Sequence, residues 1–307
     1  MDLFPLIESA FQNNKDIRVV TNLKTSRAFS EDCYTKARLI HLVLAEIRKN
    51  FSKRNTPWKK ELSKKADLSV SDSTIKDWFL GRASIPFNDL KSICKFANQE
   101  QIKKINENTC YFCTKTSSIA RFPRKNSKDL AWLVAAILCD GHMKKNCEGI
   151  CFEVSDLVLC NKFCKTFARV FETKIKHPSI RNRIDYNQTH TIHLNNVPSI
   201  LFLNKLFEIP LGKKCPIIKV PKLIFESNNE LKRTFLKGVF DTDGGKRGGG
   251  LGLTSLSEKF VDNVSELLEE FEINPHKESW INKKYNKKCF GVRFKIDAHS
   301  IFLMRQN

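Results

Sequence analysis

The chain has 307 residues, and its composition limits the class of protein it can be. Hydrophobic residues make up 41%, enough for packed cores, so a disordered tail is excluded and two domains of ordinary size are possible. The 53 Lys and Arg outnumber the 33 Asp and Glu, which gives a formal net charge of +20. Such a basic excess is typical of proteins with a polyanionic partner, and nucleic acid is the first candidate. A Lys-rich proteome is the alternative explanation.

The start of the chain lacks a basic segment followed by an apolar one, so it has no signal-peptide pattern. With eleven cysteines, we expect reduced thiols in an intracellular, cytoplasmic protein. The longest apolar run, Leu130–Cys139, is too short to span a bilayer, so no membrane partner is expected. One CxxC pair occurs, Cys110–Cys113, whereas a structural zinc site normally needs two such pairs. We therefore favour buried thiols over a zinc site.

Residues 1–36 show no clear pattern, and their role stays open. Residues 37–104 show helical apolar periodicity and predict a small all-α domain, with helices over 37–51, 58–67, 72–81 and 87–97. Ser71 or Asp72 is the expected N-cap of the third helix, and Gly81 is its expected stop.

The stretch STIKDWFLGRASIP is similar to the repressor-like helix-turn-helix family. The resemblance implies that Ser73, Thr74 and Lys76 face the major groove, because early residues of the second motif helix reach base edges. The turn ADLSVSD departs from the pattern because it is long and lacks the customary glycine. A helical bundle that packs or dimerises is the alternative. Residues 105–126 are expected to form a basic linker that lies along phosphates.

Two apolar helical runs, Leu130–Gly141 and Phe235–Gly245, both lead into Asp-Gly. An anion at a helix C-terminus is mildly destabilising, because that end carries about half a negative charge. Small residues four apart precede each aspartate at matching offsets: Ala135 and Cys139 before Asp140, and Gly238 and Thr242 before Asp243. Side chains four apart share one helix face, so we expect the two helices to pack closely and bring the aspartates together around a divalent cation. Two buried helices that each end in an Asp-Gly turn are the alternative.

The two runs resemble the two copies of the LAGLIDADG motif of homing endonucleases. LVAAILCDG (Leu133–Gly141) matches the first copy, and LKGVFDTDG (Leu236–Gly244) matches the second more closely. The resemblance implies an α+β fold of two pseudo-symmetric αββαββα repeats, 127–227 and 228–307, that form a basic saddle over a duplex. Because both motif copies occur in one chain, the resemblance is to the two-motif type of this family, which implies a monomer. Patterns after each motif agree, with strands expected over 148–155, 174–180, 190–196, 250–257, 275–282 and 287–296, and helices over 157–171, 197–207 and 258–271.

The resemblance further implies a site-specific endonuclease that uses Mg²⁺ or Mn²⁺ to hydrolyse one phosphodiester on each strand of double-stranded DNA. Asp140 and Asp243 would be catalytic metal ligands, with the backbone carbonyls of Cys139 and Thr242 nearby. Similarity to a lysine-bearing segment of intein-type members adds Lys214 as a catalytic residue ahead of Lys213 and Lys219, and Lys288 in the second repeat. An ordinary phosphate contact is the alternative for each lysine. Expected DNA contacts from the exposed strand faces are Lys174, Lys176, Arg181, Arg183, Lys284, Lys287, Arg293 and Lys295.

Three residues depart from the family's pattern. Ala135 stands where glycine is commoner, Cys139 is bulkier than usual, and Val154 stands where some members place a catalytic lysine. A non-catalytic DNA-binding regulator and an RNA-binding intron maturase are therefore alternative functions. Gly244–Gly252 lacks the phosphate-loop pattern and is expected to be a flexible turn. The chain lacks the terminal residues of an intein, so a free-standing or intron-encoded protein is expected.

Overall fold

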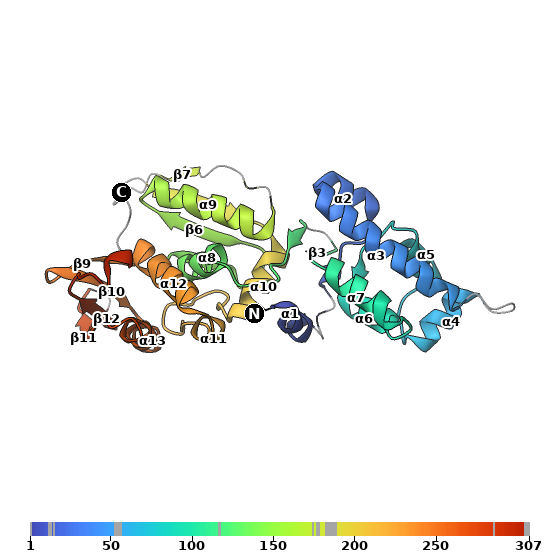
Figure 1. Ribbon diagram of the computed structural model, residues 1–307. Coiled ribbons are helices and arrows are strands. Elements are labelled where there is room, and N and C mark those ends of the chain that lie inside the picture. The colour runs from blue at the N-terminus through green and yellow to red at the C-terminus, as the bar shows by residue number, and fades with distance from the viewer. Residues whose placement is uncertain are drawn as a thin grey trace. The chain divides into compact units, whose positions relative to one another are not determined.

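The computed structural model describes residues 2–11, 14, 16–51, 57–115, 118–173, 175, 179–181, 189–284 and 286–303, with the backbone alone at 180 and 181. It divides the chain into two compact units (Figure 1). One unit is Phe4–Arg124, and the other comprises Met1–Leu3 and Lys125–Asn307. Within the described ranges, no helix is both long and apolar enough to cross a bilayer.

The Phe4–Arg124 unit is built mainly from helices. They are α1 Phe4–Phe11, α2 Leu23–Phe29, α3 Glu31–Lys49, α4 Trp58–Lys65, α5 Asp72–Phe79, α6 Phe87–Cys94 and α7 Gln99–Asn108. The Ser71 hydroxyl accepts a hydrogen bond from the Thr74 amide, which confirms Ser71 as the N-cap of α5. Gly81 adopts a φ of 62°, a left-handed conformation that glycine tolerates and that suits its predicted place after the helix. Helix α3 begins before the predicted residue 37 because Ser30 caps it at Glu31.

A small sheet in the same unit corrects the prediction of a linker over 105–126, and it adds one two-residue strand to the stretch 37–104 that was predicted to be all-α. Its strands are β1 Arg18–Val19, β2 Ile85–Pro86, β3 Tyr111–Cys113 and β4 Ala120–Arg121, in the order β2-β1-β3-β4. Part of the supposed linker is buried: the Phe112 ring stacks on the Phe122 ring with centroids 4.2 Å apart, and both side chains are fully buried. Strands this short carry no alternating pattern from which to predict them.

The cysteines are free thiols, and those of the CxxC pair are buried as expected. Cys110 and Cys113 lie in one cluster of buried side chains with Cys33. Burial raises the pKa of Cys110 to about 11, which favours the uncharged thiol.

Two repeats of the same order form the second unit (Figure 1). The first comprises α8 Lys128–Cys139, β5 Gly141–Met143, β6 Ile150–Val154, α9 Leu157–Phe171, β7 Ser179–Arg181, β8 Thr189–Leu194 and α10 Val197–Phe207. Helix α11, Lys222–Phe225, leads to the second: α12 Asn229–Thr242, β9 Gly245–Arg247, β10 Gly250–Ser255, α13 Glu258–Glu269, β11 His276–Asn282, β12 Lys287–Phe294 and a 3-10 turn, Ile301–Leu303. The strand orders β5-β6-β8-β7 and β9-β10-β12-β11 are equivalent. The predicted α+β fold of two repeats is confirmed, with a 3-10 turn as the last helical element.

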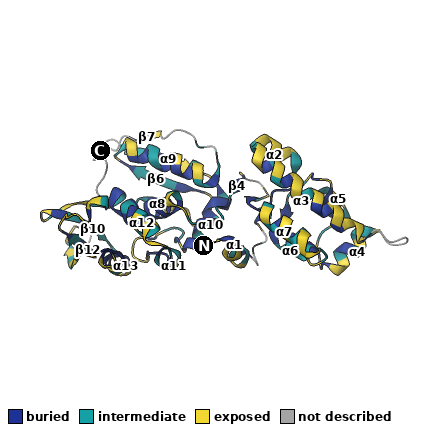
Figure 2. Ribbon diagram, in the orientation of Figure 1, coloured by how far each residue is buried: buried dark blue, intermediate teal, exposed yellow. Residues whose placement is uncertain are grey.

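Helices cover one face of each sheet in this unit. Helix α9 packs on β6 and β8, and α13 packs on β10 and β12. In the first repeat, the Phe152 ring stacks on the Phe163 ring with centroids 4.0 Å apart. Figure 2 shows the same division along α9, which has one buried and one exposed side.

The stretch Gly244–Gly252, expected to be a flexible turn, contains a β-hairpin. Arg247 on β9 pairs with Gly250 on β10. Gly248 and Gly249 form the two-residue connection with φ values of 50° and 79°. Hairpins with two-residue turns favour positive φ at these positions because the turn twist then matches the strands.

Helices α8 and α12 cross so closely that there is no room for a larger side chain at the contact. A Cβ atom at Gly238 would lie 2.7 Å from the Ala135 Cβ and 3.0 Å from the carbonyl oxygen of Trp132. The small residues that the sequence placed on one face of each helix therefore form the contact.

Replacing Gly238 with valine should force the two helices apart. Overpacking of this kind costs about 1–3 kcal/mol, so urea unfolding should show a correspondingly lower free energy for Gly238→Val. Gly245→Val is the matched control, because nothing lies within 4 Å of a Cβ at Gly245. Equal unfolding free energies for the two variants would contradict the close crossing.

Candidate metal and nucleic-acid site

The ends of α8 and α12 hold Asp140 and Asp243 in the same backbone geometry. Each aspartate is the C-cap residue of its helix, with φ and ψ of −93° and −12° at Asp140 and of −86° and −4° at Asp243. The glycine after each aspartate is required because the chain turns back against its own helix. A Cβ at Gly141 would lie 2.7 Å from the Cα of Ile137, and one at Gly244 would overlap the backbone of Phe240.

The Cys139 thiol connects the two helix ends. Burial raises its pKa well above the ordinary value, the charge of Asp243 raises it further, and a hydrogen bond with the Thr242 side chain opposes both. Burial also raises the pKa of Asp243, against the charge of Lys214 and a hydrogen bond with Cys139. The two predicted metal-binding aspartates therefore belong to one electrostatic cluster, although they lie far apart in the chain.

Lys214 lies in this cluster with only 6% of its surface exposed. Its Nζ atom donates to the carbonyl oxygens of Ile137 and Cys139, each at 2.7 Å, and to that of Leu138. Burial lowers the pKa of Lys214, while the charges of Cys139, Asp243 and Asp140 raise it. The carbonyl of Cys139, predicted as a metal ligand, is thus a hydrogen-bond acceptor for Lys214.

A cleft of about 720 Å³ opens beside Asp140 and is lined by both repeats. Lys213 and Lys214 come from the segment after α10, and Lys287 and Lys288 come from the start of β12. The structure therefore brings Asp140, Lys214 and Lys288, three of the four predicted catalytic residues, to one cleft. The fourth, Asp243, is coupled to it through Lys214 and Cys139.

The donor set at the helix ends suits a hard cation. Carboxylate and carbonyl oxygens are the ligands that Mg²⁺ prefers, and Mg²⁺ often binds through one or two carboxylates together with water and phosphate oxygens. In the part of the chain that the structure describes, no group of three or more His, Cys, Asp or Glu could hold a metal ion. Two carboxylates next to helix-end carbonyl groups are, in their chemistry, a donor set that a Mg²⁺ ion can use.

Comparison with known proteins bears on the second repeat directly. Residues 230–295, which run from α12 to the end of β12, match the family model described as a LAGLIDADG-like domain. The second repeat is a LAGLIDADG-like domain. The Asp-Gly end of α12 lies inside the matched residues.

Curated relatives match parts of the chain. It is 30% identical over 166 residues to the replication factor C small subunit of Methanocaldococcus jannaschii, covering 54% of this chain and 9% of that protein. It is 35% identical over 95 residues to a probable translation initiation factor IF-2 of the same organism, covering 30% of this chain and 8% of that protein. The chain therefore spans less than a tenth of the length of these relatives.

Solved structures of similar fold include variants of the homing endonuclease I-DmoI, at 12% identity and a TM-score of 0.42, over 57% of this chain and 93% of that one. Full-length DUF199/WhiA from Thermatoga maritima aligns at 13% identity and a TM-score of 0.41, over 58% of this chain and 55% of that one. I-DmoI itself has been solved in complex with DNA and Ca and with DNA and Mn.

The predicted DNA contacts fall into three groups. Lys174, Lys176 and Arg183 lie outside the described residues, and at Arg181 only the backbone is described. Ser73 and Lys76 are exposed and Thr74 is half-buried at the start of α5. On the LAGLIDADG-like repeat, Arg293 is half-buried, and three residues are exposed: Lys284, Lys287 and Lys295.

Sequence reasoning missed a cluster of side chains around Arg293. Lys277 on β11 bonds to Asp262 on α13, so the alternate residues Glu278 and Trp280 lie on the opposite, helix-free face. Arg247 Nη1 lies 3.2 Å from Glu278 Oε1, its guanidinium lies 5.2 Å from the centre of the Trp280 ring, and Arg293 Nε lies 3.7 Å from Glu278 Oε2. This cluster went unpredicted because β9, which carries Arg247, was taken for a turn.

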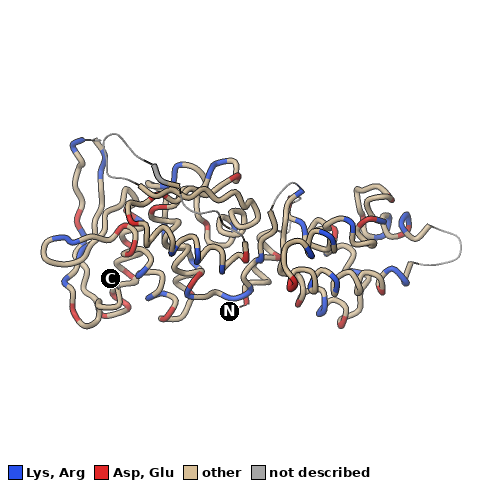
Figure 3. Tube along the Cα trace, turned by 90° about the horizontal axis from the view of Figure 1, so that it is seen from above, with Lys and Arg blue, Asp and Glu red and all other residues tan. Residues whose placement is uncertain are grey.

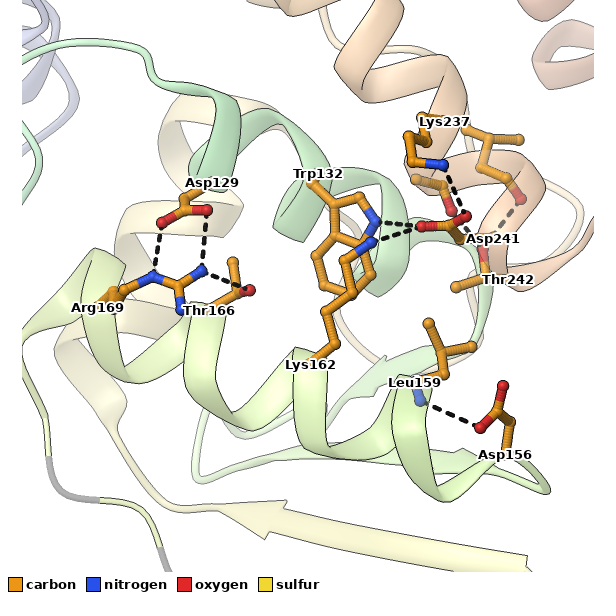
Figure 4. Close-up of polar contacts among 12 residues, drawn as sticks. Asp129, Trp132, Asp156, Leu159, Lys162, Thr166, Arg169, Lys237, Asp241 and Thr242 are labelled. Atoms are coloured by element: carbon orange, nitrogen blue, oxygen red, sulfur yellow. Dashed lines mark hydrogen bonds and ion pairs between the residues drawn. The ribbon is translucent and has the colours of Figure 1, made fainter. Parts of the chain in front are cut away.

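Asp241 is a second residue that sequence reasoning missed (Figure 4). The buried Oδ2 of this α12 residue accepts hydrogen bonds from Trp132 Nε1 on α8 at 2.8 Å and from Lys162 Nζ on α9 at 2.7 Å. Its Oδ1 lies 3.7 Å from Lys237 Nζ. A single carboxylate thus ties the LAGLIDADG-like repeat to both main helices of the first repeat. Leu138 holds the corresponding motif position in α8, and the only sequence signal was a charged residue in an apolar run.

Removal of the Asp241 carboxylate should destabilise the second unit. Asp241→Ala leaves buried donors without an acceptor, which costs about 1–3 kcal/mol. Asp129→Ala is the control, because its ion pair with Arg169 is largely exposed (Figure 4) and such pairs contribute at most about 1 kcal/mol. Guanidinium unfolding of both variants measures the difference, and equal losses would contradict a special role for Asp241.

Proposed function

We propose that the chain is a site-specific DNA endonuclease of the homing type that depends on a divalent metal. One observation carries the proposal: Asp140 and Asp243 end two closely crossing helices in matching geometry, beside a lysine-lined cleft. Both motif helices belong to one chain, which supports a monomer as the active form.

In this proposal Asp140 and Asp243 hold Mg²⁺ or Mn²⁺, with the carbonyl of Thr242 as a further oxygen ligand and that of Cys139 shared with Lys214. The metal, when bound, supplies an activated water and neutralises charge on the reacting phosphate. Exposed Lys287 and Lys288 come from the second repeat, line the same cleft as Asp140, and suit contacts with phosphate oxygens.

Double-stranded DNA is the proposed substrate. The net charge of +20 supplies a long-range attraction for a polyanion, and Lys and Arg occur on both units (Figure 3). Arg247 and Arg293 lie on the helix-free face of the sheet in the second repeat. Arginine is the side chain best suited to guanine edges in the major groove. We propose that this face contacts bases.

The Phe4–Arg124 unit is proposed to add a helix-turn-helix contact. Helix α4 packs on α5, and Ser73 and Lys76 are exposed on the first turns of α5. Residues at this position of a recognition helix reach base edges.

A non-catalytic DNA-binding regulator is the second candidate function. It is favoured by Lys214, whose three hydrogen bonds engage helix carbonyls, and by Val154, which leaves the end of β6 without a basic side chain.

Replacement of either motif aspartate should separate cleavage from binding. We expect Asp140→Asn and Asp243→Asn to lower the cleavage rate about 100-fold or more, because several kcal/mol of charge stabilisation by the metal would be lost. DNA binding in Ca²⁺ should persist. The rates are measured with Mg²⁺ on a randomised plasmid library and on DNA flanking the encoding locus.

Asp262→Asn is the control, since Asp262 forms an exposed pair with Lys277. Cleavage undiminished in the motif variants would contradict the metal assignment. Tight binding by the unaltered protein without nicking in Mg²⁺ or Mn²⁺ would favour the regulator.

The helix-turn-helix proposal predicts a separate loss of affinity. The double substitution Ser73→Ala with Lys76→Ala should weaken binding to the selected DNA site about tenfold or more, because base-edge contacts contribute about 1–3 kcal/mol each. Lys103→Ala on α7 is the control, an exposed lysine next to Glu107. Mobility-shift titrations measure both, and unchanged affinity in the double variant would favour a bundle that packs or dimerises.

A further inference from the structure

The meeting of α8 and α12 creates an electrostatic conflict that the protein must settle without help from a ligand. Each helix end carries about half a negative charge on its last carbonyl groups. Asp140 and Asp243 add two carboxylates at the same place. Burial near Asp243 weakens the screening by water, so the repulsion between these groups is larger than it would be at an exposed surface.

We propose that Lys214 is a positioning residue whose ammonium group is a built-in cation for the paired helix ends. It neutralises the last turn of α8, and this lets the two aspartates lie together before a metal or DNA is bound. The link to metal binding rests on the proposed function, whereas the capping of α8 rests on the contacts of Lys214 alone.

The hydrogen bonds of Lys214 are those of a helix cap. An ammonium group has three donors, and here they meet three consecutive carbonyl oxygens, those of Ile137, Leu138 and Cys139. These are among the carbonyls that a helix leaves without an intrahelical partner at its C-terminus. With its donors engaged in this way, Lys214 has none to offer a reacting phosphate.

The segment that carries Lys214 is itself held in place. The amides of Ile217 and Ile218 donate to the Lys214 carbonyl oxygen at 2.9 and 3.1 Å and so close a turn around it. The amide of Gly212 donates to the carbonyl oxygen of Met143 on β5 at 2.7 Å. Gly212 adopts a φ of 75° that favours glycine. The backbone therefore presents the lysine to α8 from a fixed position next to the strand that follows Asp140.

Helix α12 ends by a different arrangement, and Lys214 acts on its end only through its charge, which affects Asp243. The single Thr242 hydroxyl proton is shared between the carbonyl oxygens of Gly238 and Val239, at 2.9 and 3.0 Å from the hydroxyl oxygen. Asp243 feels the charge of Lys214, which opposes the effect of its own burial. Removal of the ammonium charge should leave the negative charge at the helix ends without a counter-charge. A bound divalent cation should then stabilise the fold by more than it does in the unaltered protein.

The test compares melting of the full chain with and without Ca²⁺, in the absence of DNA. Lys214→Gln removes the charge, Lys214→Arg keeps it, and Lys213→Gln alters the exposed neighbour. In EDTA we expect Lys214→Gln to melt about 5 °C or more below the unaltered protein, with Lys214→Arg closer to it and Lys213→Gln unchanged. Millimolar Ca²⁺ should raise the melting temperature of Lys214→Gln more than that of the unaltered protein.

A melting temperature of Lys214→Gln equal to that of Lys213→Gln would overturn the proposal. So would a lower one with the same Ca²⁺ shift as in the unaltered protein, because lost packing alone gives that result. If Lys214→Gln does not fold in EDTA, recovery of its circular dichroism signal by Ca²⁺ supports the proposal and failure to recover overturns it. If the unaltered protein cuts no DNA, the proposed nuclease activity is wrong. The melting results would still test the role of Lys214 at the end of α8.

Discussion

The close crossing of α8 and α12 determines where every other part of the candidate site must lie. Two helix backbones approach this closely only where one side chain is missing, and Gly238 against Ala135 supplies that point. Because the two helices pack closely, their C-terminal ends, which both carry partial negative charge, lie close together. The chain must compensate for the repulsion between these ends. It does so with side chains from outside the motifs. Lys214 meets the carbonyls of α8, and Lys162 and Trp132 meet the buried carboxylate of Asp241.

The two repeats share their topology but not these compensating contacts. Both sheets have the same strand order, and both motif helices end in the same C-cap geometry. Asp241 in α12 nevertheless corresponds to Leu138 in α8, and Lys214 lies in the segment between the repeats. Because the repeats are joined in one chain, a residue at their contact need not match a symmetric copy of itself. The charge of Asp241 in the second repeat is thus balanced by Lys162 of the first, and the family model matches residues 230–295 of the second repeat.

Local signals were enough to predict many elements. Helices α9 and α10 have the predicted bounds because Asp156 and Asn196 cap their starts and left-handed residues, Glu172 and Glu208, end them. Strand β6 lies within the predicted strand 148–155, and its side chains alternate between buried and half-buried positions. Strands β5 and β9 were missed because three residues are too few to show a period, and so was the small sheet of the Phe4–Arg124 unit. In the site, the matched offsets indicated Asp140 and Asp243. The hydrogen-bond donors to Asp241 and the carbonyl groups that accept from Lys214 lie 75 to 109 residues away along the chain, where no local pattern can reveal them.

A strongly basic chain with a small anionic centre has to keep the two kinds of charge in separate places. The net charge of +20 attracts a polyanion over a long range, but a lysine left free beside Asp140 and Asp243 would compete with a divalent cation for the same oxygens. Lys214 avoids this competition through the carbonyls of α8, which draw its ammonium group toward the helix and away from the solvent side of the cleft. Lys287 and Lys288 stay exposed on the other repeat, where phosphate is the natural counter-charge. In the two proposals the same residue type therefore stabilises the fold in one position and contacts a polyanionic partner in the other, and burial decides which.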